Sequence, residues 1–70
     1  MLAPVAARKV YFDDAGGFVD CPVYERNGLS PGDVLQGPAI VEQMDATTVI
    51  PPDFRARVDE FSNLLLHATS

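Results

Sequence analysis

The sequence predicts an all-β fold, a small barrel or sandwich of about six short strands. Apolar and charged residues alternate at period two, most clearly where Phe54, Ala56 and Val58 alternate with Arg55 and Arg57. Runs of β-branched and aromatic residues are short, and clusters of Gly, Pro, Asn and Asp separate them. Apolar residues nowhere recur at helical spacing over several turns.

The length of 70 residues allows one domain, and 47% apolar residues supply enough material for a small core. We expect a single β domain over residues 8–67. Residues 1–7 form a lead-in segment without clear periodicity, and residues 68–70 form a polar tail.

In the first half of the chain, residues 8–12 form a strand and residues 13–17 a turn. Residues 18–24 form a second strand with a single apolar face. Pro22 has no N–H to donate, so we expect this strand to lie at a sheet edge. Residues 27–33 form a wide loop with Leu29 turned inward.

The second half contains the other strands. After Gly37-Pro38 we expect a strand over residues 39–43, a turn at 44–46 and a strand over 47–50 that Pro51-Pro52 ends. The alternating segment 54–58 and the leucine-rich segment 64–66 are the last two strands, with a turn at 60–63 between them.

The net charge of −5 argues against nucleic acid and anionic membranes as partners, because both need clustered Lys and Arg. No apolar run approaches the roughly 20 residues of a spanning helix. The first residues, Met1 to Ala7, lack the basic start of a signal peptide. Cys21 is the single cysteine and forms no internal disulfide, which favours a cytoplasmic location.

The residues that suggest metal binding or nucleophilic catalysis have simpler explanations. Cys21 and His67 are too few for a zinc site, and Asp13 and Asp14 lack the spacing of a calcium loop, so a solvated turn is favoured. Cys21 lies between Val19 and Val23, where a buried, inert thiol is the default. His67 is expected to be exposed; a Cys21–His67 pair is the disfavoured alternative.

The remaining candidate residues are also better explained as turn, strand and surface residues than as ligand-binding or catalytic residues. Gly16-Gly17 leads into a strand, whereas a phosphate-binding loop leads into a helix. Thr47 and Thr48 are interpreted as strand residues in preference to ligands of a phosphate or a substrate oxygen. The carboxylate residues Glu25, Glu42 and Asp59 are interpreted as strand residues that point outward. The expected partners of these carboxylates are Arg26, Arg55 and Arg57, and such exposed pairs contribute little stability. We therefore predict no catalytic, cofactor-binding or metal residue in this chain.

A set of ordered motifs resembles the C-terminal segment of the hydantoinase A/oxoprolinase family, which includes N-methylhydantoinases and acetone carboxylase subunits. The resemblance covers residues 8–66. Ser62 stands where the family usually has glycine, so we expect a differently shaped final turn, and the family often has threonine near Cys21. The motifs are Val10-Tyr11-Phe12, Pro22-Val23-Tyr24, Pro31-Gly32-Asp33, Gly37-Pro38-Ala39-Ile40-Val41-Glu42, Thr47-Thr48-Val49-Ile50-Pro51-Pro52, Val58-Asp59 and Asn63-Leu64.

The resemblance implies a parent enzyme that uses ATP and a divalent metal to open cyclic amides, or to carboxylate ketones. Its ATPase core lies upstream, and its partner is a hydantoinase B-type subunit. The segment itself is then a non-catalytic C-terminal domain that packs against the remainder of the parent polypeptide. The alternative is a stand-alone β binding or assembly subunit of a related carboxylase complex, which uses a sheet edge. A carrier domain with a modified Lys9 is weaker, because Lys9 lies within a strand.

Overall fold

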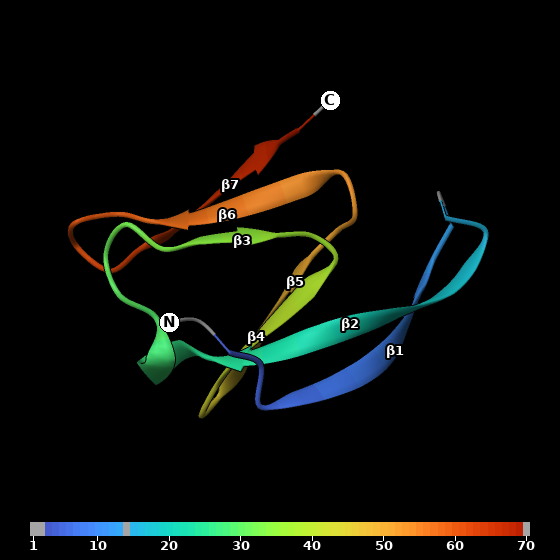
Figure 1. Cartoon of the computed structure of the whole chain (residues 1–70), viewed down its shortest axis with the longest axis horizontal. Coiled ribbons are helices and arrows are strands. Elements are labelled where there is room, and N and C mark those ends of the chain that lie inside the picture. Colours follow the sequence, from blue (N-terminus) through green and yellow to red (C-terminus); the bar gives the residue numbers. More distant parts are fainter. Residues whose placement is uncertain (1–2, 14, 70) are drawn as a thin grey trace.

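The computed structural model describes residues 3–13 and 15–69. Figure 1 shows two layers, a four-stranded sheet in the order β1-β2-β4-β5 and a three-stranded sheet in the order β3-β6-β7. The predicted all-β fold is confirmed as a small sandwich, because the described strands stay in two separate sheets and do not close into a barrel. The elements are β1 (Ala6–Phe12), β2 (Gly17–Glu25), the 3-10 turn η1 (Arg26–Gly28), β3 (Val34–Gln36), β4 (Ala39–Gln43), β5 (Ala46–Ile50), β6 (Phe54–Val58) and β7 (Leu64–Ala68).

One long bent hairpin joins the two sheets. Its first arm is β3 followed by β4, and its second arm is β5 followed by β6; β4 pairs with β5 in one sheet, and β3 pairs with β6 in the other. The bend falls at Gly37-Pro38 and, across from it, at Pro51-Pro52, where prolines cannot donate to a ladder. The Gly37 N–H donates to the Phe54 carbonyl over 2.8 Å and holds the corner.

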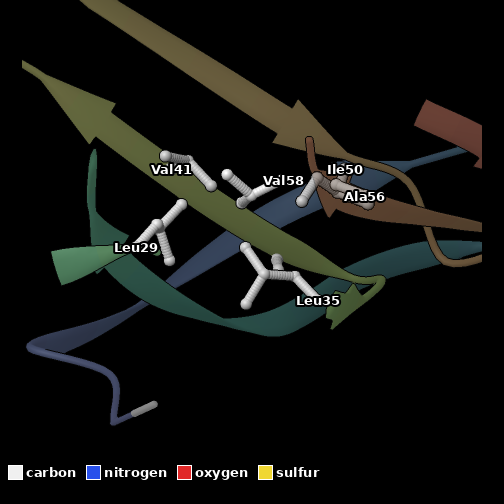
Figure 2. Packing of buried hydrophobic residues seen from close by; sticks show 7 residues of the cluster. Leu29, Leu35, Val41, Ile50, Ala56 and Val58 are labelled. Atoms are coloured by element: carbon white, nitrogen blue, oxygen red, sulfur yellow. The ribbon is translucent and has the colours of Figure 1, made fainter. Parts of the chain in front are cut away.

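The main core lies between the two sheets, and Figure 2 shows its side chains meeting there. Ala56 and Val58 point inward from β6, whereas Arg55 and Arg57 point out to solvent, as the period-two pattern predicts. Leu29 enters the core from the loop after η1, which confirms its predicted inward position. The buried members are Leu29, Leu35, Ala39, Val41, Ile50, Ala56 and Val58.

A smaller apolar cluster lies on the opposite face of the four-stranded sheet. Val23 and Ile40 are direct neighbours in the parallel β2–β4 pair, and Cys21 shares their face because it is two residues before Val23. Val10 and Phe12 of β1 pack against them. The four-stranded sheet is therefore apolar on both faces near its centre.

The prediction that residues 18–24 form an edge strand is wrong. β2 lies inside the sheet, antiparallel to β1 on one side and parallel to β4 on the other. Pro22 is accommodated because the ladder with β4 begins only at Val23, one residue later. The missing N–H of the proline is therefore not needed for the pairing with β4.

β3 is a strand that the sequence does not predict. It has three residues between the turn at 30–33 and the corner at Gly37, too few for a periodic signal. The other predicted strands are present, with ends that differ by at most two residues. No helix in the described part of the chain has the length and apolarity needed to cross a membrane.

Candidate functional site

An open hollow lies where β2 and β4 end side by side. Its volume is about 520 Å³, and its lining comes from the end of β2, from η1, and from β4 with the turn that follows it. Glu25 and Glu42 are register partners in the parallel pair, so their carboxylates lie on the same face of the sheet. The lining residues are Glu25, Arg26, Asn27, Glu42, Gln43 and Met44.

An ion pair at the edge of this hollow joins Glu42 to Arg8 of β1. Arg8 faces Cys21 in the β1–β2 register, so the pair reaches over β2 on the face of the smaller apolar cluster. The Arg8 guanidinium thereby balances one of the two adjacent carboxylates. Sequence reasoning paired Glu42 with Arg26, Arg55 or Arg57, because nothing in the local pattern shows that β1 and β4 flank the same strand.

The hollow has the character of a binding surface. It offers two carboxylates, one guanidinium, two side-chain amides and the thioether of an almost fully exposed Met44. A nucleophile paired with a general base is not among these groups. Within residues 3–13 and 15–69, no three His, Cys, Asp or Glu side chains gather to hold a metal ion. The described residues therefore do not fit a divalent metal.

The described segments also contain no glycine-rich phosphate-binding loop of the kind that leads into a helix. Gly16 forms the β1–β2 turn, with its N–H donating to the Asp13 carbonyl at 3.0 Å and a left-handed φ of 74°. The chain then enters β2 and not a helix, so backbone N–H groups do not converge on a phosphate. Asp14 lies outside the described residues. Thr47 and Thr48 belong to β5, as predicted.

The structure separates Cys21 from His67. Cys21 is fully buried in β2 of the four-stranded sheet, whereas His67 is exposed on β7 of the three-stranded sheet, as predicted for each. Burial raises the pKa of the Cys21 thiol above its usual range, and the adjacent Asp20 carboxylate adds to the shift. A thiol with a raised pKa and no access to solvent is a poor nucleophile.

We expect the Cys21 thiol to react with an alkylating reagent only when the chain unfolds. A Phe18→Cys variant is the matched control, because Phe18 lies on the same strand but is 71% exposed. The variant should take up one reagent molecule at once under native conditions and a second only in denaturant. Mass spectrometry over time measures both. Rapid labelling of Cys21 in the native protein would contradict the burial.

The turn between β6 and β7 is built on Asp59, which was predicted to be a strand residue. That prediction is wrong, because β6 ends at Val58. The Asp59 carboxylate accepts hydrogen bonds from the backbone N–H of Asn63 at 2.7 Å, from the backbone N–H of Phe61 at 2.9 Å and from the Asn63 amide at 3.3 Å. These donors, with the Asn63 backbone first, hold the pKa of Asp59 below its usual value, and the charge of Arg57 assists.

Asp59→Ala is expected to lower the melting temperature at neutral pH, by less than truncation of a fully buried core side chain such as Ile50→Ala does. The folded pKa is depressed, so the contribution of Asp59 is present above its unfolded pKa of about 3.9. That contribution is lost as pH falls through the folded pKa. The melting temperatures of wild type and variant should therefore begin to approach each other as pH falls below about 4, and they should meet only below the folded pKa of Asp59. Glu60→Ala, in the same turn, should shift the curve little at any pH.

Ser62 in the same turn has a φ of 64°, in the left-handed region that favours glycine. This is the position where glycine was noted as usual in the family. We expect Ser62→Gly to stabilise the protein by about 1 kcal/mol, because it removes the Cβ from a strained backbone. Ser62→Ala keeps the Cβ and should not stabilise. Chemical denaturation of the three proteins measures the difference, and equal stability of the Gly and Ala variants would contradict the expectation.

Comparison with known proteins connects this fold to a family. Residues 2–69 match the sequence profile described as Hydantoinase/oxoprolinase C-terminal domain. The chain belongs to this family. The hydantoinase/oxoprolinase resemblance in the sequence is thereby confirmed, and it extends over nearly the whole chain.

Three relatives illustrate where such C-terminal domains occur. An uncharacterized protein of Methanocaldococcus jannaschii is 46% identical over 61 residues, and the acetophenone carboxylase gamma subunit of Aromatoleum aromaticum is 38% identical over 61 residues. A 5-oxoprolinase of Dictyostelium discoideum is 35% identical over 57 residues.

These alignments cover most of this chain but little of the relatives. They include 87%, 87% and 81% of the chain, in the same order, but only 9%, 8% and 4% of the relatives. The chain therefore corresponds to one small domain of much longer proteins.

Proposed function

We propose that this chain is a non-catalytic structural and assembly domain of a hydantoinase/oxoprolinase-type enzyme, and that it packs against the remainder of a parent polypeptide. The observation that carries the proposal is the contrast in coverage. The domain profile matches residues 2–69, whereas the chain spans less than a tenth of each relative described above. The reactive chemistry of such an enzyme then resides outside these residues.

The exposed apolar side chains support a packing role. Phe18, Met44 and Phe61 are each more than two-thirds exposed, on three different turns or strand ends. Burying such side chains against a protein surface stabilises an assembly by about 25 cal/mol for each Å² of apolar surface removed from water. Val5, just before β1, and Tyr11 within β1 add further exposed apolar surface at one edge of the four-stranded sheet.

The parent activity belongs to the same proposal. The parent enzyme uses ATP and a divalent metal to open a cyclic amide in the cytoplasm, together with a hydantoinase B-type subunit. The name of the 5-oxoprolinase relative supports the amide chemistry. ATP and the metal are assigned to the larger catalytic part of the parent enzyme. In the described residues of this chain no three His, Cys, Asp or Glu side chains gather to hold a metal ion.

Deletion and complementation test the proposal. The purified 70-residue chain should show no ATP-dependent hydrolysis of 5-oxoproline or hydantoins. The parent enzyme without this segment should lose assembly and activity, and adding the segment as a separate chain should restore both. Hydrolysis by the segment alone, or full activity of the shortened parent, would overturn the assignment.

A second candidate is a stand-alone assembly subunit of an ATP-dependent carboxylase complex. The name of the acetophenone carboxylase gamma subunit, 38% identical over 61 residues, supports the carboxylase complex, although the chain covers only 8% of that subunit. In this case the chain is made as a separate polypeptide and purifies at a fixed ratio with a carboxylase. Finding the same residues joined to a longer polypeptide in the cell would exclude this second candidate.

A further inference from the structure

The outer edge of β7 is open, uncharged and rich in leucine. In the three-stranded sheet β7 pairs with β6 on one side, and among the described residues no strand pairs with its other side. Figure 1 shows β7 at the outside of this sheet. Its five residues, Leu64–Ala68, contain no Lys, Arg, Asp, Glu or Pro, the residues that usually prevent an edge from pairing. By contrast, the β1 edge carries Arg8 and Lys9, and β3 has only three residues. The fourth edge, β5, is also uncharged, but it carries the polar Thr47 and Thr48 where β7 carries leucines.

The hydrogen bonds to β6 show which backbone groups face this open edge. The Thr69 N–H donates to the Asp53 carbonyl at 2.8 Å, and the Asn63 carbonyl accepts from the Asp59 N–H at 2.9 Å. Backbone groups alternate in direction along an antiparallel strand. The odd-numbered positions of β7 therefore point to β6, and the even-numbered ones, Leu64, Leu66 and Ala68, present their N–H and C=O groups to the open edge.

The side chains of these outward positions are also incompletely covered. Leu66 faces Ala56 in the register, so its side chain is on the core side of the sheet, yet it remains 41% exposed. Leu64 and Ala68 lie on the same side, since they are two residues away in each direction. Leu64, Leu66 and Ala68 therefore form an apolar strip on the core side of the sheet. Among the described residues, no strand lies beyond β7 to cover this strip.

We infer that β7 pairs antiparallel with β7 of a second copy of this chain, about a two-fold axis at Leu66. The three outward positions are symmetric about Leu66, so Leu66 faces the same residue of the second copy, and Leu64 faces Ala68. Each facing pair exchanges two backbone hydrogen bonds. The face toward the core places leucine against leucine or alanine, and neither face opposes two like charges.

The self-complementarity of the strand decides in favour of a second copy as the occupant. A C2 interface needs the same patch to be complementary to itself. In this five-residue strand the outward N–H and C=O groups pair symmetrically about Leu66, and no Lys, Arg, Asp or Glu side chain opposes its own copy. The pairing joins two three-stranded sheets into one sheet of six strands. This inference goes beyond the proposed function and does not depend on it, because self-association is measured without any enzyme activity.

Sedimentation of the 70-residue chain at concentrations up to about 1 mM tests the inference, since a short edge-to-edge contact gives weak binding. The wild type should dimerise reversibly. Leu66→Lys places two ammonium groups opposite each other and should weaken the dimer at least tenfold. Val49→Lys is the matched control on β5, because Val49 is 40% exposed, and it should leave the dimer unchanged. Circular dichroism verifies that each variant is folded.

A mixture of variants tests the two-fold register. Leu66→Lys and Leu66→Glu should each be monomeric alone but should form a heterodimer when mixed. Amide exchange in the wild type provides a readout without substitutions: the N–H groups of Leu64, Leu66 and Ala68 should exchange more slowly as concentration rises. A wild type that stays monomeric throughout the range would overturn the inference. So would a dimer that Val49→Lys weakens as much as Leu66→Lys, or unchanged exchange at the three amides.

Discussion

Gly37→Ala is expected to destabilise the protein by about 3–4 kcal/mol. A Cβ built on Gly37 would overlap the backbone carbonyl oxygen of Pro51 and lie 2.8 Å from that of Phe54. Neither atom belongs to a flexible side chain, so the corner of the bent hairpin would have to open. Opening it also weakens the 2.8 Å hydrogen bond from the Gly37 N–H to the Phe54 carbonyl.

The stability of a domain of this size is roughly 4–10 kcal/mol, so the loss is a large part of the total. Gly28→Ala is the matched control, because nothing lies within 4 Å of a Cβ at Gly28 and its φ is not left-handed. Urea denaturation of both variants measures the difference. Equal losses of stability for the two variants would contradict the close approach of Gly37 to the carbonyl oxygens of Pro51 and Phe54.

Ile50→Ala is expected to cost about 2–5 kcal/mol, because it leaves a cavity in the main core. Ile50 is fully buried at the end of β5, beside the corner, and it is the largest side chain with no exposed surface among the described residues. Figure 2 shows it among residues of both sheets. Its removal should therefore loosen the contact between the layers.

A graded series separates this cavity effect from general loss of apolar surface. Ile50→Val removes one methylene and should cost about 0.5–1.5 kcal/mol. Met44→Ala removes as many non-hydrogen atoms as Ile50→Ala, but from a side chain that is 95% exposed, and it should change the free energy of unfolding by less than about 0.5 kcal/mol. Thermal and urea denaturation measure the series. Equal losses for Met44→Ala and Ile50→Ala would contradict the assignment of Ile50 to the core.

The predictions that held depend on local patterns. Alternation along residues 54–58 places Ala56 inside and Arg57 outside, because successive side chains of a strand point to opposite faces. The apolar flanks of Cys21 predict a buried thiol, and the turn residues before β2 and after β5 predict where strands stop. The order of motifs along the whole chain also predicts the family.

The predictions that failed concern neighbours in space. Pro22 suggested that β2 is an edge strand. The position of β2 inside the sheet depends on its pairing with β4, which begins where Val23 meets Ile40, a residue 17 positions later in the chain. The partner of Glu42 is Arg8, because β1 and β4 flank the same strand. Asp59 is a local exception: it is a turn residue whose carboxylate accepts from the N–H groups of Phe61 and Asn63, only two and four residues later.

Composition and local periodicity were therefore sufficient for the all-β class, the strand segments and the inward faces, since strand geometry and turn chemistry act over a few residues. The tertiary structure alone decided the strand order, the corner at Gly37, the hollow between β2 and β4, and the open edge of β7. These features arise from pairings between segments far apart in the chain, and register between distant strands leaves no periodic trace in either strand.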